Sequence, residues 1–126
     1  MREIIFRGKR KDNDEWVEGN LQCFKGFSIF ECSWKTFLPV DSKTVGQYTG
    51  LTDKNGKRIF EGDIVKVIQE RMSDITIVGF ENGAFMVYPV RGKIYERTLW
   101  HYWYNDWNIE IIGNIHDNPD LLEVNE

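Results

Sequence analysis

Short apolar runs alternate with polar and glycine-containing turns along the whole chain, and this pattern predicts a mainly β fold. Residues 4–6 and 15–17 flank the polar segment 9–14, so the chain is expected to open with a hairpin. Residues 75–80 and 84–88 flank an Asn-Gly turn, which is the clearest hairpin signal in the sequence. The direction of the chain therefore reverses mainly through tight turns.

The central segment, residues 45–67, contains the densest turn chemistry, with four glycines and an Asn-Gly pair. It predicts a strand over 44–48, a reversal at 53–57, a short return limb, and a β-branched strand over 64–68. The glycines do not match a phosphate-binding loop, because the Gly-Lys-Ser/Thr ending is missing.

Glu61 and Asp63 form a close carboxylate pair around Gly62. Such a pair can hold a metal ion or act as a general acid and base. The alternative is turn chemistry, in which Gly62 supplies a permissive backbone and Asp63 hydrogen-bonds the chain as it enters the next strand. The sequence favours the turn.

Between these segments the pattern is less regular. Gly19 interrupts the second strand, as a bulge or a close approach of another backbone would require. Lys25-Gly26 predicts a turn, and the strand after it places four alternating residues on one face: Ser28, Phe30, Cys32 and Trp34. Residues 36–43 are predicted to form a connection, because Pro39 cannot donate a ladder hydrogen bond.

Residues 95–107 fit both β and helical periods. A strand would place three aromatic residues on one face: Trp100, Tyr102 and Tyr104. A short helix capped by Thr98 would instead bring together Leu99, Tyr102, Trp103 and Asp106. The helix is favoured, and a final strand follows at 109–113.

With 126 residues the chain has the size of one domain, expected to span residues 1–126. The fold class is mainly β, a small barrel-like or strongly curved set of antiparallel sheets with about seven to nine strands and one or two short helices. Residues 70–74 are expected to form a charged turn. Asn118-Pro119-Asp120 predicts a helical turn near the end, with Asn118 as its cap.

Cysteine and charge limit the function classes. Cys23 and Cys32 are too few for a zinc site, and we expect buried thiols in a reducing cytoplasm, with a disulfide as the alternative if their segments pair. The net charge is −4, but residues 2–11 are basic and residues 117–126 are acidic. No apolar run approaches the roughly 20 residues of a membrane-spanning helix.

No residue pattern specifies a reaction, a metal or a cofactor. His101 and His116 have no nucleophile that the sequence places beside them. The candidate binding residues are instead an aromatic group and a basic group. They are Trp100, Tyr102, Trp103, Tyr104 and Trp107, with Arg7, Lys9, Arg10 and Lys11. Six rings within eight residues, counting His101, cannot all point into one core, so part of the aromatic group is expected to face solvent or a partner.

Four blocks in the order of the chain resemble the YopX family of phage and prophage proteins. They are residues 2–9, Glu15-Trp16-Val17-Glu18-Gly19, the central segment with Val45-Gly46-Gln47-Tyr48, Asp53-Lys54-Asn55-Gly56 and Glu61-Gly62-Asp63, and residues 112–119. The resemblance implies a largely β protein that works inside the host cell. It carries no established activity, so it assigns no catalytic residue.

The sequence thus predicts a non-catalytic accessory protein that binds another protein or its own copy, without a cofactor and without a membrane. The alternative is a nucleic-acid-binding small β-barrel. It would use the basic turn from Arg7 to Lys11 for phosphates and exposed aromatic rings for bases.

Overall fold

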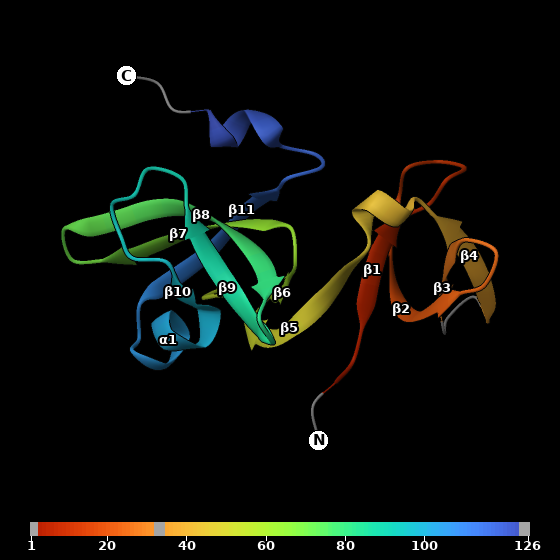
Figure 1. Cartoon of the computed structure of the whole chain (residues 1–126), viewed down its shortest axis with the longest axis horizontal. Coiled ribbons are helices and arrows are strands. Elements are labelled where there is room, and N and C mark those ends of the chain that lie inside the picture. The colour runs from red at the N-terminus through yellow and green to blue at the C-terminus, as the bar shows by residue number, and fades with distance from the viewer. Residues whose placement is uncertain (1–2, 32–34, 124–126) are drawn as a thin grey trace. The chain divides into compact units, whose positions relative to one another are not determined.

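The computed structural model describes residues 3–31 and 35–123, and these form a mainly β protein in which the neighbouring strands of known register all run antiparallel (Figure 1). The described residues contain eleven strands, which is more than expected from the sequence, one short α-helix and two 3-10 turns. The chain divides into two compact units, Met1–Gly50 and Leu51–Glu126. Whether they behave as the single domain expected from the sequence stays a prediction. No helix among the described residues is long and apolar enough to cross a membrane.

The first unit contains β4, β3, β2, β1 and the start of β5, in this order, from a six-stranded sheet whose last strand is β6 (Arg58–Phe60). Its elements are β1 (Phe6–Lys9), β2 (Trp16–Cys23), β3 (Phe27–Glu31), β4 (Thr36–Val40), the 3-10 turn η1 (Ser42–Thr44) and the start of β5 (Gly46–Thr52). The end of β4 returns to the end of β1. Arg10 forms a β-bridge with Val40, and the Asp41 N–H donates to the Lys9 carbonyl at 2.9 Å. The expected barrel-like curvature is confirmed here.

Gly19 of β2 lies directly against the backbone of β3. A Cβ atom at Gly19 would stand 2.0 Å from the Phe30 carbonyl oxygen, far inside van der Waals contact. The predicted close approach of another backbone is therefore confirmed, and it explains why the position needs glycine.

Pro39 does not interrupt the sheet. Residues 36–43 were expected to form a connection, but Pro39 lies within β4, opposite Ser28 of β3. β4 ends the row of paired strands, and on its free side the Pro39 carbonyl accepts from the Lys11 N–H at 3.0 Å. Proline is tolerated there because an edge strand does not need every N–H for the ladder.

One burial prediction in the first unit is wrong. Cys23 is an exposed free thiol at the end of β2 rather than a buried one, and the turn at Lys25-Gly26 follows directly. On β3 the fully buried side chain is Ile29, on the face opposite Ser28 and Phe30. Cys32 and Trp34, and with them the question of a disulfide, lie outside the described residues.

The second unit is an antiparallel sheet in the order β10-β9-β8-β7-β11. Its elements are the end of β5, β6 (Arg58–Phe60), β7 (Asp63–Gln69), β8 (Met72–Glu81), β9 (Ala84–Pro89), β10 (Arg97–Thr98), α1 (Leu99–Tyr104), β11 (Asn108–Asn114) and the 3-10 turn η2 (Pro119–Leu122). Its core combines one face of this sheet, Ile59 of β6 and the helix. The buried residues are Ile59, Val65, Val67, Val78, Val87, Ile94, Leu99, Tyr102 and Ile109.

The turns of this unit follow the sequence closely. Asn82 and Gly83 have φ of 53° and 82°, as a two-residue hairpin between β8 and β9 requires. The charged turn is shorter than the expected 70–74, because β8 already starts at Met72, which pairs with Gln69. Asp74 is buried within β8, where its carboxylate accepts from the Arg91 and Lys93 N–H groups.

The carboxylate pair of the central segment is turn chemistry, as expected. One oxygen of Asp63 accepts from the Phe60 N–H at 2.8 Å, which ties the chain just before β7 begins. Gly62 has a φ of 88°. The helical turn at residues 119–122 forms with Asn118 at its N-cap position, as predicted, but the Asn118 side chain makes no capping hydrogen bond and instead accepts from the Asn114 N–H.

The helix of the ambiguous aromatic segment forms as favoured. Thr98 is its cap, because its hydroxyl accepts from the His101 N–H at 3.1 Å, and Leu99 and Tyr102 face the core. Helices this short depend on tertiary packing and on their caps.

Thr98→Ala is expected to lower the free energy of unfolding by about 1 kcal/mol, because the His101 N–H loses its acceptor. Thr98→Ser keeps the hydroxyl and is the matched control. Denaturant unfolding of both variants measures the difference, and equal losses in both would show that the methyl group, not the cap, is responsible.

Candidate aromatic groove

One side of the helix α1 is anchored in the core, and most of the aromatic rings on the helix are exposed. Leu99 is fully buried, and Tyr102 is 3% exposed with its hydroxyl donating to the Tyr95 carbonyl. Burial raises the pKa of the Tyr102 phenol, so the hydroxyl stays protonated and continues to donate. These anchors hold the remaining aromatic residues of the helix in position.

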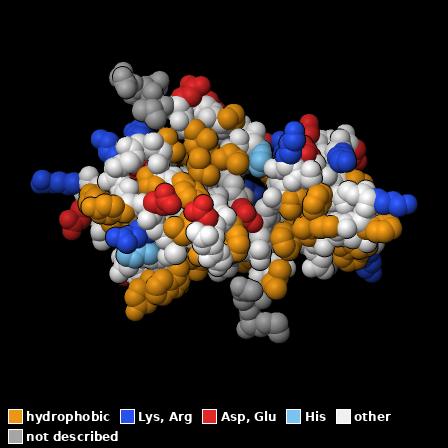
Figure 2. Space-filling view, in the orientation of Figure 1, with side chains coloured by type: hydrophobic (Ala, Val, Ile, Leu, Met, Phe, Trp, Pro, Cys, Tyr) orange, Lys and Arg blue, Asp and Glu red, His pale blue; other side chains and the backbone are white. Residues whose placement is uncertain are grey.

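Three large rings of α1 face outward. Trp100 is 55% exposed and Tyr104 is 64% exposed, and the two stack with ring centroids 4.7 Å apart and an interplanar angle of 20°. Trp103 is 43% exposed. Figure 2 shows hydrophobic side chains at the surface over this helix, at the lower left of the view. The expectation that only part of the aromatic group packs into the core is confirmed; a binding role for it stays a prediction.

Beside these rings the second unit has a groove of about 430 Å³, which we call the aromatic groove. It lies between the turn after β5 and the link from α1 to β11. Its lining residues are Thr52, Asp53, Lys54, Trp103, Tyr104, Asp106, Trp107, Asn108 and Ile109. Trp107 is half-buried and packs edge to face against Tyr102, with the two ring centroids 5.0 Å apart.

Backbone hydrogen bonds fix both walls of the groove. The Lys54 N–H donates to the Ile109 carbonyl at 2.9 Å, and the Trp107 N–H donates to the Tyr102 carbonyl at 3.1 Å. Asp106 has a φ of 59°, a left-handed conformation that Asp tolerates and that turns the chain from α1 into β11. The groove is therefore preformed.

Thr52, Asp53 and Lys54 form one wall of the groove, which we call the turn wall, and Asp53 is its most heavily hydrogen-bonded side chain. Its Oδ1 accepts from the Asn55 and Lys57 N–H groups, and its Oδ2 accepts from the Ile111 N–H at 3.1 Å. Burial acts against ionisation, but these three hydrogen bonds and the charge of Lys57 outweigh it and hold the pKa of Asp53 below its ordinary value. These contacts tie Asp53 to the backbone of the turn and of β11, and the lowered pKa makes its carboxylate a weak base.

The groove is lined by aromatic, charged and polar side chains together with Ile109. Its lining residues contain no histidine, cysteine or serine, and the described residues contain no group of three or more His, Cys, Asp or Glu that could hold a metal ion. Of the residues predicted as binding candidates, the groove brings together Trp103, Tyr104 and Trp107. Trp100 lies beside it through its stack with Tyr104, and Tyr102 supports it from the core.

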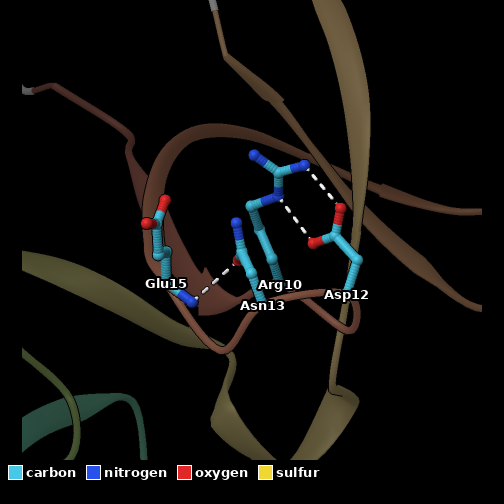
Figure 3. A network of polar contacts seen from close by, with 4 residues as sticks. All are labelled: Arg10, Asp12, Asn13 and Glu15. Carbon is cyan, nitrogen blue, oxygen red and sulfur yellow. Dashed lines mark hydrogen bonds and ion pairs between the residues drawn. The ribbon is translucent and has the colours of Figure 1, made fainter.

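The four basic candidates lie in the first unit and are largely engaged there. The Arg7 guanidinium is 4.7 Å from the Trp16 ring centroid, and the Lys9 ammonium is 5.7 Å from it. Arg10 makes a two-bond pair with Asp12, at 2.9 and 2.6 Å (Figure 3). This hydrogen bonding from Arg10 lowers the pKa of Asp12. Lys11 is exposed.

A second hollow, of about 400 Å³, lies next to the basic turn. Its lining residues are Arg10, Glu15, Trp16, Val17, Glu18 and Glu31, so three carboxylates stand against one guanidinium. Figure 3 shows how the turn is tied, with Asn13 accepting from the Glu15 N–H while Arg10 reaches Asp12. This hollow beside the turn therefore carries more acidic than basic side chains.

Sequence reasoning missed the turn wall of the groove. Thr52, Asp53 and Lys54 meet Asn108 and Ile109 only after folding, across more than 50 positions of the chain. The Asp53-Lys54-Asn55-Gly56 turn was a local signal for a reversal, but nothing in it indicated the strand against which it packs.

Comparison with known proteins agrees with this architecture. The family model described as YopX protein matches residues 5–123. Protein EF1440 from Enterococcus faecalis has a similar structure, with a TM-score of 0.57 and 22% identity over 98% of this chain and 100% of that one. Protein yopX from Bacillus subtilis is similar with a TM-score of 0.54 and 22% identity over the full length of both chains. No curated protein matches the chain.

Proposed function

The chain belongs to the YopX family, and we propose that it is a non-catalytic module that binds another protein through the exposed rings of α1 and the aromatic groove beside them. The observation that carries the proposal is the exposure of Trp100, Trp103 and Tyr104 on a helix whose other side is anchored in the core. Tryptophan and tyrosine are enriched at the centres of protein interfaces, because they bury a large area at a small entropic cost. The resemblance to phage and prophage proteins supports an accessory role in the host cytoplasm.

The first unit gives nucleic-acid binding less support. A phosphate backbone is bound by Lys and Arg side chains that release counterions. Arg10 is already paired with Asp12, and Glu15, Glu18 and Glu31 line the adjacent hollow. We therefore prefer a protein partner.

The test compares wild type with Trp100→Ser/Trp103→Ser in affinity capture from extracts of infected host cells. We expect proteins that wild type retains, with and without nuclease, and that the double variant loses. Both replaced side chains are exposed, so the variant should fold, and circular dichroism and its Tm are the controls.

Two other results would contradict the proposal. Captured proteins that disappear after nuclease treatment, together with salt-dependent affinity for a labelled single strand at physiological ionic strength, would indicate nucleic-acid binding. Equal capture by both forms would remove the aromatic surface from the interface. Light scattering on the two forms distinguishes self-association from binding of a different protein.

A further inference from the structure

The ionisable side chains that line the aromatic groove are Asp53, Lys54 and Asp106. Asp53 is buried, and its oxygens accept three backbone hydrogen bonds. The Lys54 ammonium lies 3.2 Å from a Glu110 carboxylate oxygen. Asp106 is exposed, and within residues 3–31 and 35–123 its carboxylate has no hydrogen bond or ion pair. The groove therefore presents one uncompensated negative charge.

The same groove presents aromatic rings beside that charge. Trp103, Tyr104 and Trp107 line it, and the first two are exposed. The face of an aromatic ring attracts a cation, and the attraction adds to that of a neighbouring carboxylate. The chain makes this kind of contact internally, since the Arg97 guanidinium lies 5.5 Å from the Tyr95 ring centroid in the same unit. An anionic ligand would be repelled by Asp106.

We propose that the aromatic groove binds an arginine side chain of a partner protein, with the guanidinium stacked on the tryptophan rings and paired with the Asp106 carboxylate. The proposal rests on the proposed protein-binding function and adds the chemistry of the partner. Arginine fits better than lysine, because its planar guanidinium stacks on aromatic rings and bonds a carboxylate through two N–H groups. A volume of about 430 Å³ admits the side chain with its adjoining backbone.

The stacked pair Trp100 and Tyr104 extends the surface beyond the groove. Residues flanking the arginine in an extended segment of the partner would pack on these rings. The occupant is therefore a peptide segment rather than a free cation, and the charge at Asp106 determines which residue of that segment enters the groove.

The probe is the peptide acetyl-Gly-Ser-Arg-Ser-Gly-amide, titrated to millimolar concentration while the indole N–H signals of the full chain are followed by NMR. We expect saturable shifts of the Trp103 and Trp107 signals. The same peptide with citrulline, which keeps the shape and loses the charge, should bind roughly tenfold more weakly. Asp106→Asn should weaken binding of the arginine peptide by a similar factor. Asparagine tolerates the left-handed backbone at this position, so the variant should fold.

Asp120→Asn is the matched control, because it removes an exposed carboxylate outside the groove and should leave binding of the arginine peptide unchanged. Equal shifts with the arginine and citrulline peptides, or no effect of Asp106→Asn, would overturn the arginine assignment while the capture experiment still supported protein binding. Loss of nuclease-resistant capture would overturn both. Shifts of the groove signals by a single-stranded oligonucleotide with none by the peptide would also contradict the proposal.

Discussion

Gly19→Ala is expected to lower the free energy of unfolding by about 3 kcal/mol, the upper part of the usual range for adding a methyl group to a packed interior. The added Cβ would stand 2.0 Å from the Phe30 carbonyl oxygen and 3.3 Å from a methyl group of Ile29. The obstacle is backbone, which cannot rotate away as a side chain can. β2 and β3 would have to separate, and the hydrogen bonds between them would lengthen. Denaturant unfolding measures the loss.

Gln22→Ala is the control for this prediction, because it changes an exposed side chain on the same strand and is expected to stay within about 0.5 kcal/mol of wild type. If Gly19→Ala were as stable as Gln22→Ala, the backbones would not approach each other as closely as described.

Asp53→Asn is expected to lower the free energy of unfolding by about 2 kcal/mol at neutral pH, because hydrogen bonds to a charged acceptor are lost from a buried site. The amide that replaces the carboxylate keeps one acceptor and turns an N–H₂ group toward a backbone donor. The turn wall of the aromatic groove should loosen as a result. Denaturant unfolding of both forms at a series of pH values measures the difference.

The pH dependence has a definite sign. The pKa of Asp53 is depressed below 3.8 in the folded protein, so its stabilising effect is fully present above that value. It is lost as the pH falls through the folded pKa. The gap between wild type and Asp53→Asn should therefore stay constant from pH 7 to about pH 5 and shrink at lower pH. Asp120→Asn, at an exposed site, should show no such gap. A gap that grew in acid would contradict the role of the carboxylate.

The local elements followed from the sequence where a short stretch of chain contains their cause. Asn82-Gly83 needs only its own backbone freedom to form a tight hairpin, and Thr98 caps the residues just after it. The prediction at Pro39 was wrong because proline is excluded from central strands and not from edges, and only the pairing order shows that β4 is an edge. Burial at Cys23 and Ile29 likewise depends on which face of the sheet the rest of the chain covers.

The sequence by itself determined the mainly β class, most turns, the helix cap and the aromatic segment from which three rings emerge. Those features depend on backbone preferences and on hydrophobic periodicity, which act over a few residues. Only the tertiary structure decided that Asp53 and Lys54 would face Trp103 and Trp107 across one groove, and that Arg10 would be neutralised by Asp12. Contacts between distant segments, and the state of each charge, depend on which surfaces are buried together and on the orientation of each side chain, and local sequence does not encode these.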